Sequence, residues 1–258
     1  MTSDYTTVTE CPGDKVTREG LDMLVTRYAF ARQLVLNKDV LEIACGAGQG
    51  LGVLAEAARS VVGGDFTGGL LAKARSCYGA SMRLVRLDGH QLPFRDGIFD
   101  VVLVYEAVYY FESPESLLRE CARVLRPEGM VVLCTVNKEW RDFNPSPFAT
   151  TYLSAAELKS VLSERFDDVE IRGAFTAMPG SSRQAAAASL KRLAIRFGLV
   201  PKTIQGKQWL KRLFMGKLLM IPSRLSVGLG TYHAPTAIAE PSAAQSDWKI
   251  LFVVARAR

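Results

Sequence analysis

The sequence lacks the features of a secreted, disulfide-stabilised or metal-binding protein. Its five cysteines are odd in number and no two are spaced as C-x-x-C, so neither a disulfide framework nor a zinc site is indicated. The stretch MTSDYTTVTECPGDKVTREG at the start has no basic segment followed by an apolar one. No apolar run approaches the roughly 20 residues that span a bilayer. We therefore expect a cytoplasmic protein with reduced thiols.

Acidic residues are missing from one long stretch. Between Ile171 and Ala239 there is no Asp or Glu but there are eleven Lys and Arg, so this stretch carries +11 and the rest of the chain −5. Its cations are interleaved with Leu, Ile, Phe, Met and Trp, a pattern compatible with a membrane-surface helix, an acidic substrate or nucleic acid. A solvated helix face is the alternative, but it usually carries both signs. We expect a partner with negative charge.

What is present is typical of a globular α/β protein. With 258 residues, 48% apolar and 22% charged, the chain can bury one sizeable core. Apolar runs alternate with segments that favour helix, which predicts a parallel sheet covered on both faces. The expected strands are Val40–Ala44, Val61–Asp65, Arg83–Leu87, Phe99–Tyr105, Met130–Val136, Val169–Phe175 and Trp248–Ala255. The expected helices include Leu51–Arg59, Leu70–Tyr78, Glu115–Leu125 and Ala155–Phe166, the last opened by a capping box of Ser154 and Glu157.

A glycine-rich turn follows the first expected strand, in VLEIACGAGQGLG from Val40 to Gly52. Such a turn lets a ligand approach the backbone closely. A phosphate-binding P-loop is excluded because no Lys followed by Ser or Thr comes after Gly50. The dinucleotide fingerprint is weakened because Leu51 stands where its third glycine belongs. The carboxylate of Glu42 favours a ligand that carries a cation.

Four motifs together resemble the class I S-adenosylmethionine-dependent methyltransferases, of the methyltransferase type 11 kind. They are VLEIACGAGQG, VVGGDFT, RLDGHQLPFRDGIFDVVLVYEAVYYF and RVLRPEGMVVL, and the resemblance covers about residues 21–175 together with the last strand. The resemblance implies a doubly wound, Rossmann-like α/β sheet of seven strands with an antiparallel last strand, plus a basic, mostly helical insertion between strands six and seven. We expect an N-terminal helical cap (1–38), a cofactor-binding domain (39–175 and 246–258) and an insertion or lid (176–245).

The resemblance implies S-adenosylmethionine as the cofactor. Glu42 would balance the ammonium of its methionine part, Asp65 would accept both ribose hydroxyls, and Asp88 would accept the adenine amino group. Seen alone, an Asp after a strand is more often a turn former or helix cap. The residues assigned to the cofactor are Tyr28, Glu42, Ala44, Gly46, Gly48, Asp65, Phe66, Asp88, Gly89 and Tyr105.

Methyl transfer requires a nucleophile held in line with the methyl carbon, and a hydroxyl nucleophile also needs its proton removed. The candidate catalytic residues are His90, because histidine changes charge near neutral pH, and Tyr110, at a place where many members of the family carry His. A turn cap is the alternative role for His90. Core packing is the alternative for the aromatic residues of EAVYYF.

The candidate acceptor contacts are Tyr109, Asn137, Trp140 and Tyr152, a polar and aromatic rim that fits a sugar ring or an aromatic acceptor. The resemblance of YYF, NKEW and NPSPF to enzymes of cell-surface polysaccharide and natural-product clusters implies a small-molecule or glycan acceptor, such as a phosphorylated or lipid-linked sugar. An anionic membrane surface is a further expected partner, with a peripheral location. The alternatives are an RNA methyltransferase, which lacks an N-P-P-[YF] clamp here, a Rossmann oxidoreductase, and a non-catalytic scaffold with the same fold.

Overall fold

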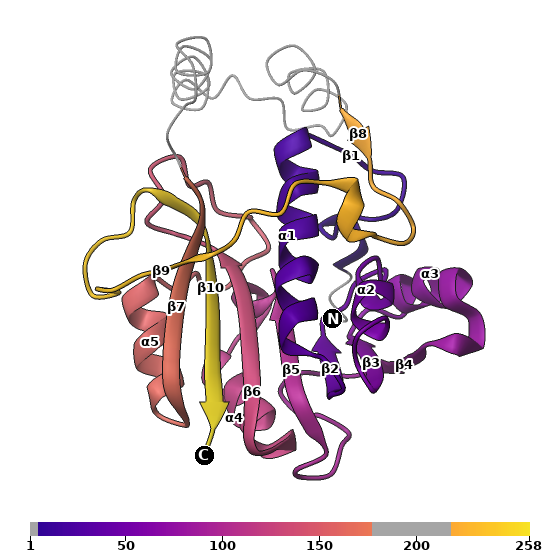
Figure 1. Ribbon diagram of the computed structural model, residues 1–258, viewed down its shortest axis with the longest axis horizontal. Coiled ribbons are helices and arrows are strands. Elements are labelled where there is room, and N and C mark those ends of the chain that lie inside the picture. Colours follow the sequence, from indigo (N-terminus) through magenta and orange to yellow (C-terminus); the bar gives the residue numbers. More distant parts are fainter. Residues whose placement is uncertain (1–4, 177–217) are drawn as a thin grey trace.

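The centre of the fold is a sheet of eight strands (Figure 1). The computed structural model describes residues 5–176 and 218–258 of the chain. The strands lie in the order β4-β3-β2-β5-β6-β10-β7-β9. Their bounds are β2 (Asp39–Ile43), β3 (Ser60–Asp65), β4 (Arg83–Arg86), β5 (Phe99–Tyr105), β6 (Leu125–Val136), β7 (Phe166–Thr176), β9 (Thr236–Ala237) and β10 (Trp248–Ala257).

The sheet is mixed, with a parallel part and an antiparallel part. β2 pairs in parallel with β3 and β5, β3 pairs with β4, and β5 pairs with β6. The last strand, β10, inserts antiparallel between β6 and β7. These pairings confirm the expected Rossmann-like α/β fold and the antiparallel last strand.

The sheet has one strand more than the seven that were expected. Strand β9 pairs antiparallel with β7, where Arg172 faces Ala237 and Gly173 faces Thr236. Without β9, the outer edge of β7 would expose its backbone N–H and C=O groups. A strand of two residues is too short for an alternating apolar pattern, so the sequence gives no sign of it.

The expected basic insertion is described only in part. Residues 177–217 lie outside the described residues, so the prediction of a mostly helical insertion concerns a region of which the structure says nothing. The described part, 218–245, contains β8 (Leu219–Met220), the short 3₁₀ helix η4 (Val227–Leu229) and β9, and no α-helix. Strand β8 pairs with β1 (Lys15–Val16) near the start of the chain.

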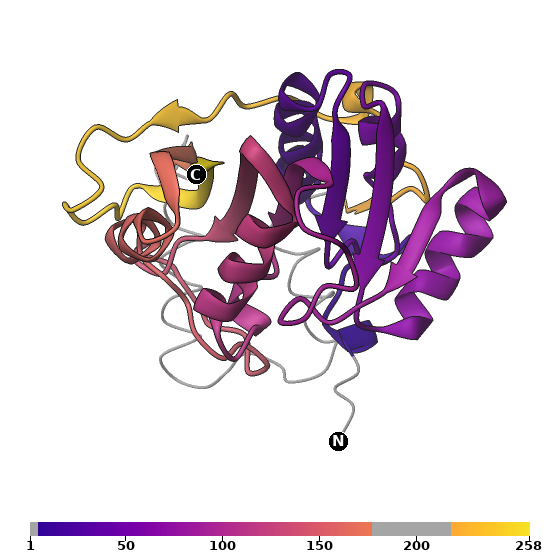
Figure 2. The ribbon, with the colours of Figure 1, turned by 90° about the horizontal axis from the view of Figure 1, so that it is seen from below.

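Helices cover both faces of the sheet (Figure 2). α1 (Arg18–Leu34), α2 (Leu51–Ala55) and α3 (Gly68–Tyr78) pack on one face, and α4 (Pro114–Val124) and α5 (Ala155–Ser163) pack on the other. The capping box at the start of α5 is present as predicted, with Ser154 and Glu157 each accepting a backbone N–H of the other. No helix in the described ranges combines the length and the apolar character needed to cross a membrane.

Helix α2 is shorter than predicted, ending at Ala55 rather than Arg59. After it, the backbone bonds to the turn before β2: the N–H of Asn37 donates to Ala57 and the N–H of Arg59 donates to Lys38. These hydrogen bonds replace the ones that a longer helix would make. The helix therefore ends early, and the chain continues into β3.

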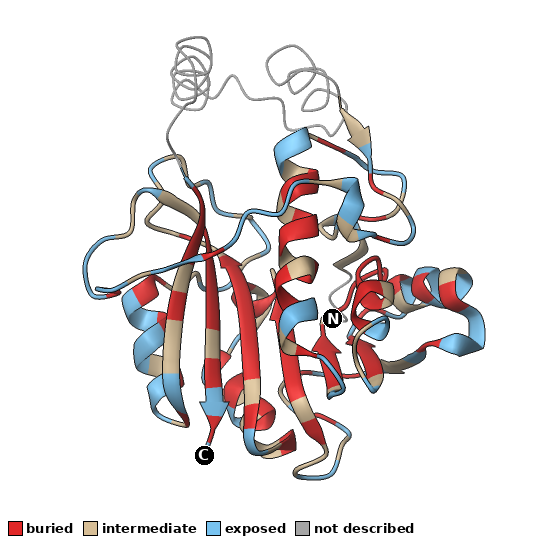
Figure 3. Ribbon diagram, viewed as in Figure 1, coloured by how far each residue is buried: buried red, intermediate tan, exposed pale blue. Residues whose placement is uncertain are grey.

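The central strands β2, β3, β5, β6 and β10 are buried along most of their length (Figure 3). Leu41, Val102 and Val132 are fully buried, which explains the near-continuous apolar runs in the sequence. The parallel strands β2 to β5 all end at one edge of the sheet. The loops that begin there bring together the residues of a single cavity.

Candidate active site

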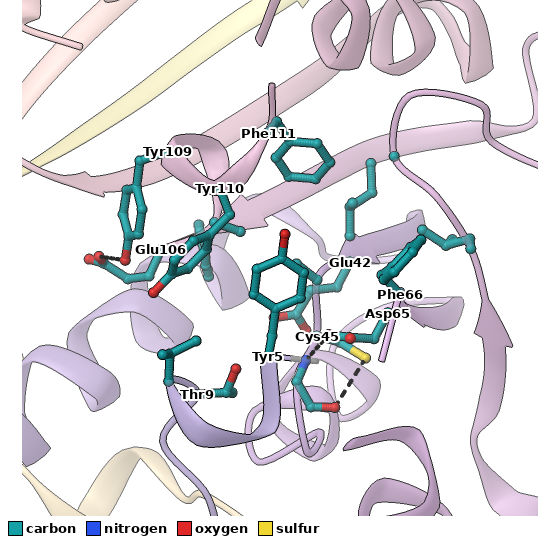
Figure 4. Close-up of a pocket in the computed structure, with 18 of the residues that line it drawn as sticks. Tyr5, Thr9, Glu42, Cys45, Asp65, Phe66, Glu106, Tyr109, Tyr110 and Phe111 are labelled. Atoms are coloured by element: carbon teal, nitrogen blue, oxygen red, sulfur yellow. Dashed lines mark hydrogen bonds between the residues drawn. The ribbon is translucent and has the colours of Figure 1, made fainter. Parts of the chain in front are cut away.

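A cavity of about 580 Å³ lies at the carboxyl ends of β2, β3, β4 and β5 (Figure 4). Its size is in the range of small-molecule and cofactor sites. The N-terminal residues and α1 form a further wall. Twelve of the predicted site residues line it: Tyr28, Glu42, Ala44, Gly46, Asp65, Phe66, Asp88, Gly89, His90, Tyr105, Tyr109 and Tyr110.

Glu42 is a buried carboxylate in the floor of this cavity. Its side chain projects from β2, with the residue 1% exposed, and Oε1 accepts a hydrogen bond of 2.6 Å from the hydroxyl of Tyr28. The other oxygen, Oε2, is buried and has no hydrogen-bond partner among the described residues. Burial raises the pKa of Glu42 to about 7, the tyrosine hydrogen bond opposes that rise, and the negative charge of Asp65 adds to it.

A second buried polar atom in the same wall also lacks a partner. The hydroxyl of Tyr105, at the end of β5, has no hydrogen-bond partner in the described part of the chain. Its ring packs edge-on against that of Tyr28, with 5.7 Å between the centroids. Unsatisfied buried polar groups are costly, so two of them lining one cavity indicate a polar ligand. A ligand that carries an ammonium group fits both, because it can donate to Oε2 of Glu42 and to the tyrosine oxygen.

Asp65 ends β3 and forms the turn after it. Its Oδ1 accepts from the N–H of Thr67 at 2.7 Å, and Oδ2 accepts from the N–H of Gly46 at 2.9 Å. Burial raises the pKa of Asp65, and these backbone hydrogen bonds oppose the rise. Asp65 therefore does form the turn. Each of its carboxylate oxygens still keeps a lone pair that a ligand can use. Phe66, beside it, is 37% exposed and faces the same cavity.

Asp88 and His90 form a pair in the loop after β4. Oδ1 of Asp88 accepts the backbone N–H of His90 and lies 2.9 Å from the ring nitrogen Nδ1. The imidazole packs edge-on against Phe111, whose ring also covers Gly89 closely. The other ring nitrogen, Nε2, is buried without a hydrogen-bond partner within the described residues. Asp88 thus caps the turn by accepting the backbone N–H of His90, and the imidazole still offers a free ring nitrogen.

Glu106 is the centre of a polar cluster in another part of the cavity wall. It follows β5 in a left-handed backbone conformation, φ 50°, which is strained for a residue with a side chain. Its Oε2 accepts from the hydroxyl of Tyr109 at 3.1 Å, and Oε1 lies 3.3 Å from Nη2 of Arg27. The thiol of Cys134 is 3.7 Å from Oε1. Three neighbours from three elements fix this carboxylate.

An aromatic wall stands beside Glu106 and consists of Tyr5, Tyr109 and Tyr110. The ring of Tyr110 lies 5.4 Å from that of Tyr5 and 4.6 Å from that of Tyr109. Burial raises the pKa of both Tyr109 and Tyr110, so these phenols stay protonated at neutral pH. Tyr110 can therefore donate a hydrogen bond at neutral pH but does not take up a proton there.

Four predicted site residues do not line the cavity. Gly48 adopts φ 78°, and a Cβ there would lie 3.0 Å from Ala74 and 3.1 Å from Leu51. This glycine gives helix α3 room to pack, instead of clearing space for a ligand chain. Tyr152 stands behind the cavity wall, with its ring stacked 4.7 Å from that of Tyr109.

Asn137 and Trp140 lie at the exit of β6 and are not among the residues that line the cavity. Asn137 is fully buried, and its side-chain amide donates to the backbone oxygens of Gln245 and Trp248. The ring of Trp140 lies 5.3 Å from the ammonium of Lys249. Both side chains thereby tie the loop after β6 to the start of β10.

Several of the residues missed by the sequence prediction come from the N-terminal segment. Tyr5 lies in a short 3₁₀ helix, η1 (Tyr5–Thr7), and its N–H donates to Oγ1 of Thr67 at 3.4 Å. The backbone oxygen of Glu10 accepts from the amide of Gln49 at 2.6 Å. These contacts fold the segment over the glycine-rich turn. No periodic pattern in the sequence predicts these contacts, because they depend on a loop that meets the sheet only in the folded chain.

The charge of the cavity is mostly negative. Arg27 is the one Lys or Arg among the described lining residues, and it is paired with Glu106. The carboxylates that line the cavity are Glu10, Glu42, Asp65, Asp88, Glu106 and Glu112. Such a surface favours a ligand with net positive charge.

Comparison with known proteins gives the same answer as the motifs. Residues 41–133 match the model of a methyltransferase domain. A probable S-adenosylmethionine-dependent methyltransferase of Mycobacterium tuberculosis is 33% identical over 168 residues, which are 60% of this chain and 61% of the relative. A demethylmenaquinone methyltransferase of Parafrankia sp. is 30% identical over 203 residues, 68% of this chain and 76% of the relative. The chain thus spans less than two thirds of the length of the mycobacterial relative, but more than two thirds of the length of the Parafrankia relative.

Solved structures share the fold. A methyltransferase of Thermotoga maritima, described as a possible histamine N-methyltransferase, superposes with a TM-score of 0.57 at 14% identity and covers 92% of both chains. Phosphoethanolamine N-methyltransferase 2 of Haemonchus contortus, in complex with S-adenosylmethionine, superposes with a TM-score of 0.56 at 14% identity, covering 96% of this chain and 53% of the other. With the motifs, the cavity and these relatives in agreement, the chain belongs to the class I S-adenosylmethionine-dependent methyltransferases, the family in which S-adenosylmethionine is the methyl donor.

Proposed function

We propose that this chain transfers the methyl group of S-adenosylmethionine to a hydroxyl group on a ring of a small molecule or a glycan. The observation that carries the proposal is the contrast between the two ends of the cavity. One end has carboxylates and close backbone that suit a cationic cofactor, and the other has an aromatic wall around Glu106. The acceptor ring is a sugar, a phenol or a quinol.

The cofactor end is proposed to hold S-adenosylmethionine through residues of the three strand ends. Oε2 of Glu42 and the hydroxyl of Tyr105 suit the ammonium group, because both are buried and unpartnered within the described residues. Asp65 and Asp88 are the proposed partners of the ribose and the adenine. Phe66, Gly89, Ala44 and Gly46 are the proposed close neighbours of the cofactor. Once bound, the cofactor supplies a methyl group already activated by a sulfonium.

The acceptor end is proposed to hold the ring and handle its proton. The ring packs against the tyrosines of the aromatic wall, beside Glu106. Glu106 is already paired with Arg27 and bonded to Tyr109, whereas Nε2 of His90 has no partner in the described ranges. We therefore assign the proton of the hydroxyl to Nε2 of His90. The phenol of Tyr110 donates a hydrogen bond and orients the acceptor.

The N-terminal segment is proposed to close the site. Residues 1–38 supply Tyr5, Arg27 and Tyr28 to the cavity, which supports the assignment of this part as a cap. Covering the acceptor excludes water, which strengthens the hydrogen bonds inside.

The basic stretch has a separate proposed role. With Arg27 the one Lys or Arg among the described lining residues, a phosphate on the acceptor would need cations from elsewhere. The stretch between Ile171 and Ala239 has eleven of them, although most fall in residues 177–217, outside the described part. We propose that it binds the phosphate or lipid-linked portion of the acceptor, or an anionic membrane surface.

The names of the relatives support a ring as acceptor. Several of them, including the Parafrankia protein, are demethylmenaquinone methyltransferases, so by name they act on a quinone compound. The aromatic wall of this chain suits a flat ring of that kind, and it suits the face of a sugar equally well.

The proposal is tested by incubating the protein with S-adenosylmethionine labelled in its methyl group and separate pools of quinols, phenols, nucleotide sugars, lipid-linked sugars and RNA. We expect label in one of the ring-containing small-molecule or lipid-linked pools. A Glu42→Gln variant serves as control, because it should lose cofactor binding and labelling together. Label in RNA alone would favour the RNA alternative, and binding of the cofactor without transfer to any pool would favour the scaffold.

A further inference from the structure

Gly48 and Gly50, two of the closely spaced glycines after β2, face protein side chains instead of the cavity. Gly50 is the last residue before α2, and its backbone, φ −92° and ψ −11°, is open to any residue type. A Cβ placed there would lie 1.9 Å from Cζ and 2.0 Å from Cε1 of Tyr28. The glycine is therefore needed for space, because the tyrosine ring occupies the volume of a side chain at this position.

The ring that fills this space connects two parts of the cofactor end. Tyr28 comes from α1, lies over Gly50 and packs edge-on against Tyr105. From there its hydroxyl reaches Oε1 of Glu42 at 2.6 Å, while Oε2 has no partner among the described residues. One carboxylate oxygen is thus held in place by the protein and the other is left for a ligand.

We propose that Tyr28 positions the carboxylate of Glu42 for the amino group of the cofactor, and that Gly50 is required because it leaves room for the tyrosine ring. This inference rests on the proposed function, since it assumes that Glu42 receives the amino group. It goes beyond it by giving Tyr28 an indirect role: the tyrosine acts on the cofactor through Glu42.

The protonation of Glu42 affects how an amino group binds to it. The surroundings of Glu42 raise its pKa to about 7. At neutral pH the carboxyl group is therefore partly protonated, and below pH 7 it is mostly protonated. A protonated carboxyl group cannot pair with an ammonium, so binding must expel the proton below that pH. The hydrogen bond from Tyr28 favours the charged form and so eases the expulsion.

Other ionisable groups near Glu42 act on the same equilibrium. Asp65 on β3 raises the pKa of Glu42. Burial raises the pKa of Tyr105 and of Cys45, so both side chains stay neutral, and that of Tyr78 is also raised. Arg27, next to Tyr28 on α1, is paired with Glu106. Tyr28 is the side chain whose hydrogen bond lowers the pKa of Glu42, which makes it the residue to change.

The test is calorimetric titration with S-adenosylhomocysteine, the demethylated cofactor, from pH 5.5 to 8.5. The wild-type protein should bind more weakly as the pH falls through about 7 and should release close to one proton per ligand at pH 6, measured in two buffers of different ionisation enthalpy. Tyr28→Phe keeps the ring and removes the hydroxyl. It should weaken binding roughly threefold to tenfold at pH 7, shift the midpoint to higher pH, and approach wild-type affinity at pH 8.5.

A second variant examines the glycine. Gly50→Ala should displace the ring of Tyr28 and reproduce the upward shift of the midpoint. Gly68→Ala is the matched control, because a Cβ at that glycine, at the start of α3, meets nothing within 4 Å. It should leave the pH profile unchanged.

The outcomes separate the inference from the proposed function. If Tyr28→Phe lowers affinity by the same factor at every pH, Tyr28 only packs and the inference is overturned while cofactor binding stands. If the wild-type protein binds no S-adenosylhomocysteine at any pH, the proposed function itself fails. Titration of the ligand's own amino group is common to all the proteins and cancels in the comparison.

Discussion

The two ends of the cavity are built in different ways. At the cofactor end, Glu42, Asp65 and Asp88 lie in β2, at the end of β3 and just after β4, and backbone N–H groups hold the second of them. At the acceptor end, Glu106 is held by side chains from α1 and from the loop after β5, and the wall around it includes Tyr5 from the start of the chain. The carboxylates of the cofactor end follow the strands of one sheet, whereas the acceptor end is assembled from a helix, a loop and the N-terminal segment.

This difference means that the two ends should respond differently to mutation. Parallel strands place their ends at one edge whatever the loops contain, so the cofactor end follows from the sheet itself. The acceptor end depends on how the N-terminal segment and the loops fold over that edge, which is where members of one fold vary. Substitutions at the first end should change cofactor affinity, and substitutions at the second should change turnover.

The largest effect is expected from Glu42 in the protein without cofactor. Its pKa rises from 4.5 to about 7 on folding, so its contribution to stability is fully present below pH 4.5 and lost as the pH rises through 7. The loss amounts to about 3 kcal/mol. Chemical denaturation of wild type and Glu42→Gln at pH 5, 6, 7 and 8 should show a decline in the wild type that the variant lacks. Parallel curves for the two proteins would mean that Glu42 is ionised in the free protein.

His90 tests the acceptor end. If it takes the proton of the acceptor hydroxyl, His90→Ala should lower turnover by roughly a hundredfold or more and change cofactor affinity little. The measurement is kcat with a saturating acceptor, together with the Kd for S-adenosylhomocysteine. Turnover close to wild type would remove His90 from the proton transfer. A loss of cofactor affinity instead would place it at the cofactor end, beside its partner Asp88.

Asp65 tests the cofactor end. Asp65→Ala leaves the N–H groups of Gly46 and Thr67 without their acceptor and removes the proposed ribose contact. We expect cofactor binding to weaken by about 1.5–3 kcal/mol, which is the usual contribution of a hydrogen bond to a charged group. Calorimetry on a variant shown to be folded by circular dichroism checks this. Unchanged affinity in the folded variant would leave Asp65 with its turn-forming role alone.

Tyr109→Phe is a smaller change at the acceptor end. It removes the hydroxyl that donates to Oε2 of Glu106 at 3.1 Å but keeps the ring stacked on Tyr152. Loss of one such hydrogen bond is worth about 0.5–1.5 kcal/mol, so turnover should fall a few-fold to tenfold. Tyr152→Phe is the control, because it keeps the same stack and removes a hydroxyl that accepts from the N–H of Ser146 and does not donate to Glu106. Equal effects of the two variants would mean that the hydrogen bond to Glu106 contributes nothing of its own to turnover.

The contrast between the ends also explains what the sequence could predict. Strands such as Val40–Ala44 and Val61–Asp65 are recognisable as apolar runs, and Glu42 and Asp65 are found by their places on those strands. The two-residue strand β9 and the pairing of Arg27 with Glu106 have no such signal, because both depend on contacts between segments far apart in the chain.

The glycines show the same limit on a smaller scale. From spacing alone, Gly46, Gly48 and Gly50 look alike, and we expected Gly48 to clear space for the cofactor. The structure separates them: Gly46 lines the cavity, Gly48 faces α3 and Gly50 faces the ring of Tyr28. Spacing reveals a bare backbone, but only the packing of α1 and α3 decides which neighbour uses the space.

The smallest effect is expected from the basic stretch, and it would extend the acceptor end beyond the cavity. Lys207, Lys211 and Arg212 lie outside the described residues, and the prediction rests on their charge alone. Replacing all three by Glu should raise the KM for a phosphorylated or lipid-linked acceptor a few-fold and leave cofactor affinity unchanged. Added salt should have the same effect, because exposed charges are screened beyond about 8 Å at physiological ionic strength.

The same triple variant distinguishes the other partners that the charge favours. Loss of binding to vesicles of anionic lipid, with an unchanged KM for a soluble acceptor, would assign the stretch to a membrane surface. Loss of binding to RNA would favour the nucleic-acid alternative instead. If acceptor kinetics, vesicle binding and RNA binding are all unaffected, the stretch is a solvated cover, and the acceptor end stops at the aromatic wall. In that case the acceptor must be small and uncharged enough to suit a cavity whose described lining has Arg27 as its one Lys or Arg.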